Sequence, residues 1–368
     1  MADPRIARLA SRLINSVDLR PGENILIECT DTPPEIAKAL LYTASQQYGA
    51  NVILKTYDSE VEKNFIVYGS KEAKERRADH ELALMEEMHA YIAIRGAKNA
   101  YDMASVPGNR LTEYKKIMQP VLRYRVDHTK WCITRWPNAS MAQEAKMSTE
   151  LFENFYFDAC LVNYKKMAEA SKPLVKLMSE AKDVRIVAPG TDLTFSIESM
   201  PAIPCCGDKN IPDGEVYTAP VKNSVNGVIA YNTPTVYLGK PFSNITLKFE
   251  EGQIVEAKCG SGDQEALEAI FNTDEGARFV GEFAMGLNRM VKRPMCDILF
   301  DEKIAGSIHF TPGNAYQDAW NGNRSAIHWD LVLIMTPEYG GGEVWFDGQL
   351  VQKDGQFVHP ALADLNDL

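Results

Sequence analysis

The sequence predicts an α/β protein with an N-terminal parallel-sheet domain and a strand-rich α+β C-terminal domain that carries a candidate metal site. Three observations support this prediction. Strand and helix signals alternate over the first half, strand signals dominate after about residue 180, and two of the six histidines, His309 and His328, lie close together in the second half. A chain of 368 residues is long enough for two domains. We expect them to span 1–180 and 181–368.

The first half reads as repeated strand–helix units. In its first helix, Ile6, Leu9 and Leu13 fall on one helical face. Each strand is followed by a helix, which predicts a parallel sheet covered on both faces. No glycine-rich phosphate loop follows any of these strands, so nucleotide chemistry is not indicated. The expected helices are 4–16, 31–48, 60–88 and 110–126, and the expected strands are 24–28, 51–55, 90–95 and 130–135.

The second half is dominated by short strands separated by turn signals. One or two helices over 147–178 precede it, and one further helix is expected over 263–281. The turn at Glu251–Gly252 and the segment 342–348 are typical of hairpins. The expected strands are 184–188, 192–197, 228–231, 245–249 and 254–257.

Composition excludes several classes of function. The formal net charge of −11 disfavours binding to nucleic acid or anionic membranes, which requires basic surfaces. No apolar run approaches the roughly 20 residues that span a bilayer. The first residues read as a helix rather than a signal peptide, so we expect a cytoplasmic protein. The seven cysteines have no CxxC spacing and are expected to be free thiols, although Cys205–Cys206 leaves a redox or thiophilic-metal alternative open.

The candidate metal site lies between Phe300 and Val332. His328 and Asp330 stand two positions apart in a β-branched and aromatic run, 327–334, which we interpret as a strand. Alternate residues of a strand share a face, so an imidazole and a carboxylate would point to one place, as divalent metals require. His309 lies in a second β-like run. The alternative interpretation is that both histidines are ordinary hydrogen-bonded residues of the core or its rim.

Two glutamates are candidate acidic partners for these histidines. Glu215 lies in the segment PDGEVYTAP, and Glu282 is expected at the end of the 263–281 helix, in GEFAMGLN. Carboxylates in apolar surroundings need a partner, and a metal ion is one. The alternative is that both glutamates are exposed to water, one in a turn and one at a helix end.

Taken together, GEVYTAP, GEFAMGLN, FDEKIAGSIHFTPGNAY and SAIHWD resemble the successive motifs of the thermophilic-type metallo-aminopeptidases, the aminopeptidase T/PepS group. The resemblance extends to GTDLTFSI and PGENILIE and covers most of the chain. It implies that the C-terminal domain is catalytic and holds two metal ions, and that the protein is a homodimer. The implied metal ligands are Glu215, Glu282, His309, His328 and Asp330, and the implied catalytic residues are Tyr316 and Glu282.

The resemblance implies an exopeptidase that removes N-terminal residues from short peptides. Two divalent ions, zinc, cobalt, magnesium or manganese, would activate a water molecule. Tyr316 would donate a hydrogen bond to the oxyanion, and Glu282 would act as general base. The same superfamily also resembles iron(II) dioxygenases that cleave the ring of dihydroxypyridine around a single metal. That mononuclear dioxygenase is the alternative function.

Overall fold

The computed structural model describes residues 3–99 and 101–368, and it confirms the predicted α/β class. Two compact units are present. The first comprises Met1–Leu161 with Gly207–Pro212, and the second comprises Val162–Cys206 with Asp213–Leu368. The chain thus returns once to the first unit, where it adds a short edge strand. The predicted domain boundary at residue 180 stays a prediction.

The first unit is built on a five-stranded sheet in the order β2-β1-β3-β4-β8, and every neighbouring pair is parallel. This confirms the parallel sheet expected from the alternation of strands and helices. The strands are β1 (Asn24–Thr30), β2 (Asn51–Tyr57), β3 (Ala90–Arg95), β4 (Lys130–Arg135) and β8 (Asn210–Ile211).

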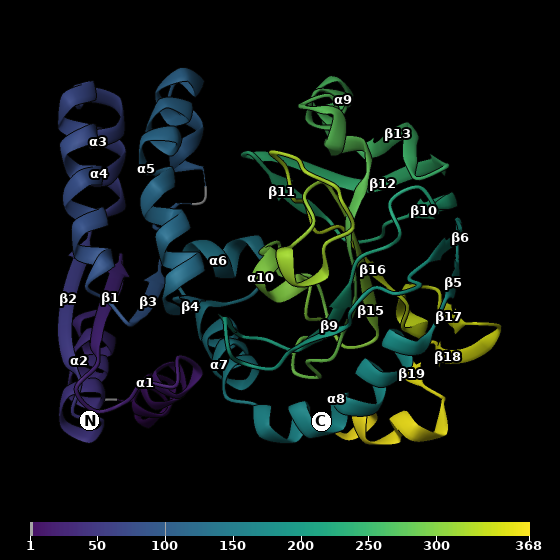
Figure 1. Ribbon diagram of the computed structural model, residues 1–368, viewed down its shortest axis with the longest axis horizontal. Coiled ribbons are helices and arrows are strands. Elements are labelled where there is room, and N and C mark those ends of the chain that lie inside the picture. The colour runs from purple at the N-terminus through teal and green to yellow at the C-terminus, as the bar shows by residue number, and fades with distance from the viewer. Residues whose placement is uncertain (1–2, 100) are drawn as a thin grey trace. The chain divides into compact units, whose positions relative to one another are not determined.

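Helices α4 and α5 pack against one face of this sheet (Figure 1). Leu26 and Tyr91 of the sheet form a buried cluster there with Ala78 and Val121 of the helices. The single helix expected over 60–88 is two helices. Gly69 ends the first, because a Cβ at this position would lie 2.5 Å from the Phe65 carbonyl oxygen. The helices of this unit are α1 (Pro4–Ser16), α2 (Pro34–Tyr42), η1 (Thr43–Gln47), α3 (Ser59–Tyr68), α4 (Lys71–Glu86), η2 (Asp102–Ser105), α5 (Gly108–His128), α6 (Ala139–Glu144) and α7 (Thr149–Cys160).

The second unit contains two sheets. The larger follows the order β11-β12-β10-β6-β5-β17-β18-β19, with β13 paired to β12, and the smaller follows β16-β15-β14-β9-β7. The larger sheet comprises β5 (Asp183–Ala188), β6 (Thr191–Ser196), β10 (Asn226–Ala230), β11 (Thr235–Tyr237), β12 (Lys240–Glu250), β13 (Gln253–Ser261), β17 (Glu343–Phe346), β18 (Gln349–Lys353) and β19 (Gln356–Phe357). The smaller comprises β7 (Ile203–Cys205), β9 (Glu215–Thr218), β14 (Val280–Gly286), β15 (Ser307–Pro312) and β16 (Val332–Ile334).

The helix expected over 263–281 is wrong beyond its first half. Helix α9 ends at Phe271, a 3₁₀ turn follows, and the chain enters strand β14 at Val280. The remaining helices of this unit are α8 (Tyr164–Glu180), α9 (Gln264–Phe271), η3 (Glu275–Arg278), α10 (Ile298–Asp301), η4 (Gln317–Ala319), η5 (Pro337–Tyr339) and η6 (Pro360–Asp367).

Aromatic side chains form part of the core that joins the two sheets of the second unit. The ring of Phe195 on β6 lies 5.0 Å from that of Phe283 on β14 and 4.9 Å from that of Phe310 on β15, measured between centroids. All three residues are buried. Since side chains alternate along a strand, the residues next to Phe283 and Phe310 point to the opposite face of the smaller sheet. That face carries the candidate site.

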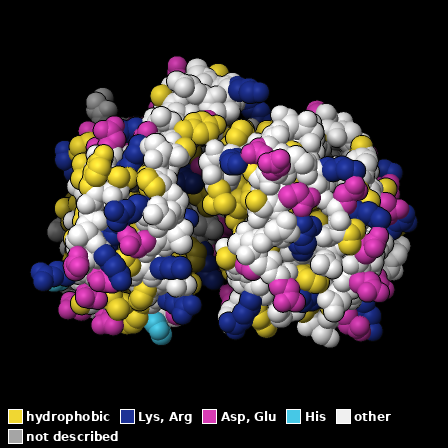
Figure 2. Space-filling view, turned by 90° about the horizontal axis from the view of Figure 1, so that it is seen from above, with side chains coloured by type: hydrophobic (Ala, Val, Ile, Leu, Met, Phe, Trp, Pro, Cys, Tyr) yellow, Lys and Arg dark blue, Asp and Glu magenta, His cyan; other side chains and the backbone are white. Residues whose placement is uncertain are grey.

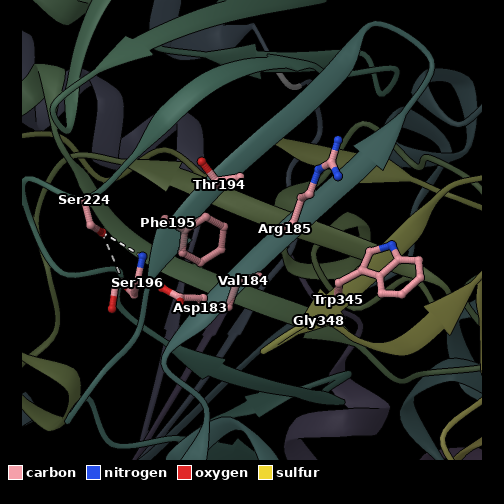
Figure 3. A pocket seen from close by; sticks show the side chains of 9 residues that line it. All are labelled: Asp183, Val184, Arg185, Thr194, Phe195, Ser196, Ser224, Trp345 and Gly348. Carbon is pink, nitrogen blue, oxygen red and sulfur yellow. Dashed lines mark hydrogen bonds between the residues drawn. The ribbon is translucent and has the colours of Figure 1, made fainter.

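A hollow of about 580 Å³ lies over strands β5, β6 and β17 (Figure 3). Arg185 and Trp345 stand over it, and the Ser224 hydroxyl accepts a hydrogen bond from the Ser196 amide at 2.9 Å. Its lining contains a single carboxylate, Asp183, and neither histidine nor cysteine. This hollow therefore lacks the ligands of a metal centre.

Charged side chains of both signs are interspersed on the face of the molecule shown in Figure 2. None of the helices within the described residues is long and apolar enough to cross a membrane.

Candidate metal centre

Three neighbouring strands place their functional side chains on one face of the smaller sheet. In the antiparallel pairs, His309 on β15 lies opposite Ala284 on β14, and Glu215 on β9 lies opposite Gly286. Glu282 is two residues from Ala284 and therefore shares its face. Because Ala284 and Gly286 have little or no side chain, space remains between the glutamates and the histidine. The sheet thus forms the floor of an acidic site.

The five predicted ligands form two overlapping groups. Glu215, Glu282 and His309 make up the first, and Glu282, His328 and Asp330 make up the second, each with ligand atoms within 4.8 Å of one another. The Oε1 atom of Glu282 lies 3.0 Å from Nε2 of His309, and its Oε2 atom lies 3.4 Å from Nε2 of His328. The two oxygens of Glu282 therefore face different histidines.

Hydrogen bonds outside these groups orient His328 and Asp330. The Nδ1 atom of His328 lies 2.8 Å from the Asn314 carbonyl oxygen, which can only accept, so Nδ1 carries the proton. The Nε2 atom is then free to bind a metal, an arrangement common among metal-binding histidines. The Thr311 hydroxyl donates to Oδ1 of Asp330 at 2.7 Å. Both side chains are held before any ion binds.

The unsatisfied atoms of this site fit a bound metal. The Oε2 atoms of Glu215 and Glu282 are buried without a hydrogen-bond partner among the described residues. Leaving such atoms unpaired is costly, and most buried polar groups in proteins have partners. Carboxylate oxygens and imidazole nitrogens are ligands suited to zinc and similar divalent ions. These carboxylate and imidazole side chains therefore fit a divalent metal ion.

A buried lysine lies beside the first ligand group. Lys303 is 1% exposed, and its Nζ atom lies 2.7 Å from Glu215 Oε1, 2.8 Å from Glu302 Oε1 and 3.5 Å from Asp213 Oδ1. The sequence argument missed Asp213, Glu302 and Lys303 as members of the site. The only signal was their position inside the PDGE and FDEK segments, next to the predicted ligands. Cys205 also comes close to Asp213 and Glu215, but Lys303 already supplies a cation to this corner.

The carboxylates set the proton affinities of the histidines. Burial alone would lower the pKa of His309, but Glu215 and Glu282 outweigh burial and raise this pKa to about 9. For His328, burial likewise lowers the pKa, while Tyr316 and Asp330 raise it well above the usual value. Metal ligands must be deprotonated, so an ion that binds here displaces protons from both imidazoles.

Tyr316 stands at the edge of the site. Its ring lies 4.6 Å from the His328 ring and 5.9 Å from the Tyr217 ring, measured between centroids. About half of Tyr316 is exposed, at 48%. A side chain that touches a proposed ligand and still reaches solvent can contact a substrate.

The structure corrects the secondary structure predicted around Glu282 and around His328, although both residues lie in the site. Glu282 does not end a helix: it lies inside β14 and is buried, as is Glu215, so the exposed alternative is wrong for both. The strand expected over 327–334 is regular only over Val332–Ile334. His328 instead forms an isolated bridge with Gly313, and its Nε2 atom lies 3.2 Å from Oδ1 of Asp330. His309 lies on a strand, as expected.

The comparisons with known proteins agree on one family. The family model described as thermophilic metalloprotease (M29) matches residues 2–357. Aminopeptidase PepS of Streptococcus thermophilus is 25% identical, with 94% of this chain and 93% of the relative covered. Aminopeptidase T of Thermus thermophilus is 38% identical over a region that covers 40% of this chain and 37% of the relative. The solved structure titled wild-type AmpT from Thermus thermophilus has a TM-score of 0.84 at 21% identity, covering 97% of this chain and 99% of that one, and so shares the fold.

Proposed function

This chain belongs to the thermophilic metalloprotease (M29) family and is a metallo-aminopeptidase, and from that premise we propose that it hydrolyses short peptides with two metal ions. One observation carries the proposal. Glu282 belongs to both candidate ligand groups and directs one oxygen toward His309 and the other toward His328. A carboxylate placed in this way could be shared by two ions, whereas a single ion would leave one of the two ligand groups, and its histidine, without a role.

The charge of the site also supports two ions. Five carboxylates come together here, and the ammonium group of Lys303 neutralises one of them. When all five are ionised, four negative charges remain, which equal the charge of two divalent cations. We assign Glu215 and His309 to one ion, His328 and Asp330 to the other, and Glu282 to both.

The bound ions would polarise the scissile carbonyl and make water nucleophilic near neutral pH. The protein's own groups complete the reaction. Tyr316, which is half-exposed and has its ring next to His328, would donate a hydrogen bond to the oxygen that becomes negative as the peptide carbonyl is attacked. Tyr316→Phe should therefore lower kcat about 100-fold with a smaller change in KM, and an unchanged kcat would remove Tyr316 from the mechanism.

A carboxylate at the centre must accept the proton of the attacking water. The sequence suggests Glu282, but both of its oxygens face histidines. Glu302 is the better candidate because it pairs with Lys303, and within the described residues neither histidine of the site forms an ion pair with it. Burial, together with Asp330 and Glu215, raises the pKa of Glu302 to about 8, against the effect of Lys303. We propose Glu302 as the general base and Glu282 as the bridging ligand.

Substitution of these two glutamates separates their roles. Glu302→Gln should lower kcat at least 100-fold while the metal content stays at the wild-type value. Glu282→Gln should lower both kcat and metal content, because it weakens a ligand shared by two ions. If Glu302→Gln loses metal and Glu282→Gln keeps it, the two roles are reversed.

The aminopeptidase activity itself is tested with leucine p-nitroanilide and leucyl peptides. His328→Ala should abolish hydrolysis and reduce the bound metal, whereas His80→Ala, on the exposed side of α4, should leave both unchanged. Wild-type turnover by His328→Ala would refute the ligand assignment. Oxygen consumption with dihydroxypyridine and ferrous iron would instead support the dioxygenase.

The proposal extends to the assembly and setting of the enzyme. We propose a cytoplasmic homodimer in which residues 181–368 carry the chemistry. The support for this is the resemblance to the aminopeptidase T/PepS group together with the position of all five candidate ligands in the second unit. Sedimentation equilibrium that returns the monomer mass of 41.1 kDa at micromolar concentration would contradict the dimer.

A further inference from the structure

A second feature adjoins the metal centre. A cavity of about 560 Å³ is lined by the loop that connects β15 to His328, together with Asp274. Two of its lining residues contact His328. The centroid of the Tyr316 ring lies 4.6 Å from that of the imidazole, and the Asn314 carbonyl oxygen accepts a hydrogen bond from the Nδ1–H group. A peptide bound at the metal centre therefore has this cavity beside it.

The cavity contains one cation, Arg324. Its guanidinium carbon lies 5.3 Å from the centroid of the Trp320 ring, and both residues line the cavity. Within the described part of the chain, no carboxylate forms an ion pair with Arg324. A cation–π contact with an indole holds a guanidinium near the ring and leaves its N–H groups able to bind an anion. Arg324 is thus oriented and available to an anion.

The acid of the cavity is already engaged. Asp274 accepts hydrogen bonds from the Ser325 hydroxyl and the Ala326 amide, each at 2.7 Å. Burial would raise the pKa of Asp274, but these donors outweigh it and lower the pKa. Asp274 therefore fixes the backbone next to Arg324, while Arg324 keeps its own donors for a ligand.

We propose that this cavity is the subsite for the C-terminal side of the substrate and that Arg324 binds the free carboxylate of a short peptide. The proposal rests on the aminopeptidase function above and specifies its substrate class. A guanidinium binds a carboxylate through two parallel hydrogen bonds, which a terminal amide cannot form. An extended peptide advances about 3.3–3.6 Å per residue, so a fixed Arg324 selects for length as well as charge.

Matched substrates test this subsite. We expect metal-loaded enzyme to prefer the free acid over the C-terminal amide about tenfold in kcat/KM for one of the two peptides, leucyl-leucine or leucyl-glycyl-glycine, and less for the other, whose length does not match Arg324. Arg324→Gln should remove this preference and leave kcat/KM for leucine p-nitroanilide within twofold, because that substrate has no carboxylate. Arg324→Lys should retain part of the preference through its charge. Arg185→Gln, in the hollow of Figure 3, is the control and should behave as wild type.

Two outcomes would overturn the subsite. One is equal kcat/KM for acids and amides in the wild-type enzyme, and the other is an equal loss on all substrates in Arg324→Gln, which indicates a structural role. Calorimetric binding of D-leucyl-D-leucine and its amide measures the same preference without turnover. If the acid binds tighter only when Arg324 is present but nothing is hydrolysed, the subsite stands and the peptidase function fails.

Discussion

At the scale of the residue, three of the five proposed ligands are fixed by a neighbour that is not itself a proposed ligand. The Asn314 carbonyl sets the tautomer of His328, Thr311 holds Asp330, and Lys303 occupies one oxygen of Glu215. Such supporting contacts fix the direction of ligand atoms and reduce the reorganisation needed on binding. The site is therefore largely formed by the fold rather than by the ions.

Lys303 gives the sharpest energetic prediction at this scale. Lys303→Met removes the ammonium group that contacts Asp213, Glu215 and Glu302. Removing one partner of a buried ion pair typically costs about 3–5 kcal/mol, because the remaining charges stay buried. Denaturant unfolding of the metal-free protein measures this loss. Exposed Lys292→Met should change stability by less than about 0.5 kcal/mol, and a similarly small change for Lys303→Met would contradict the account.

At the scale of the element, the smaller sheet and the loop after β15 create the site jointly. Strand β14 bulges between Val280 and Glu282, and Gly281 lies in the bulge. A Cβ at Gly281 would lie 2.3 Å from the Asn314 carbonyl oxygen, the atom that orients His328. Bulges often redirect side chains near active sites, and this one brings the strand against the loop.

Gly281→Ala should therefore weaken the metal site without touching a ligand. The new methyl group forces the Asn314 carbonyl away, so His328 loses its fixed tautomer. We expect the ion held by His328 and Asp330 to bind at least tenfold more weakly, as measured by metal titration. Gly108→Ala is the matched control, since a Cβ there meets nothing within 4 Å. Equal metal affinity in both variants would contradict the role of the bulge.

The C-terminal end of helix α10 carries a pH-dependent feature. Asp301 is buried, its Oδ1 atom accepts a hydrogen bond from the Met295 amide, and burial raises its pKa well above the usual value. The folded state thus binds this proton more tightly than the unfolded state, so stability falls as the pH rises from the unfolded pKa toward the folded one. Asp301→Asn should raise Tm more at pH 8 than at pH 5. An equal change in Tm at both pH values would contradict the claim that ionising Asp301 destabilises the folded protein.

How far the sequence predicts these elements depends on whether the signal is local. The alternating strands and helices of the first unit, and the strand that carries His309, follow from periodicity and turn residues. The sequence predicts Glu282 at the end of a helix, but Gly276 and Gly281 fit close backbone contacts that only the tertiary structure creates. Lys303 was missed for a similar reason, since two of its three carboxylates, Asp213 and Glu215, lie in a segment far away in the sequence.

At the scale of the whole molecule, the chemistry is concentrated in one unit. All five candidate ligands, Tyr316 and Arg324 lie in the second unit, while the first unit carries a parallel sheet without a phosphate-binding loop. The formal net charge of −11 does not by itself locate the site, and charged side chains of both signs are interspersed on the face shown in Figure 2. The close grouping of buried carboxylates locates the site.

The metal content of the purified protein tests the central claim most directly. The protein should be prepared without chelator and analysed for elements per chain, before and after reconstitution with zinc or cobalt. We predict close to two divalent ions per chain in the wild type and a loss of at least one in His328→Ala. A single iron atom per chain, or no metal after reconstitution, would contradict a two-metal aminopeptidase.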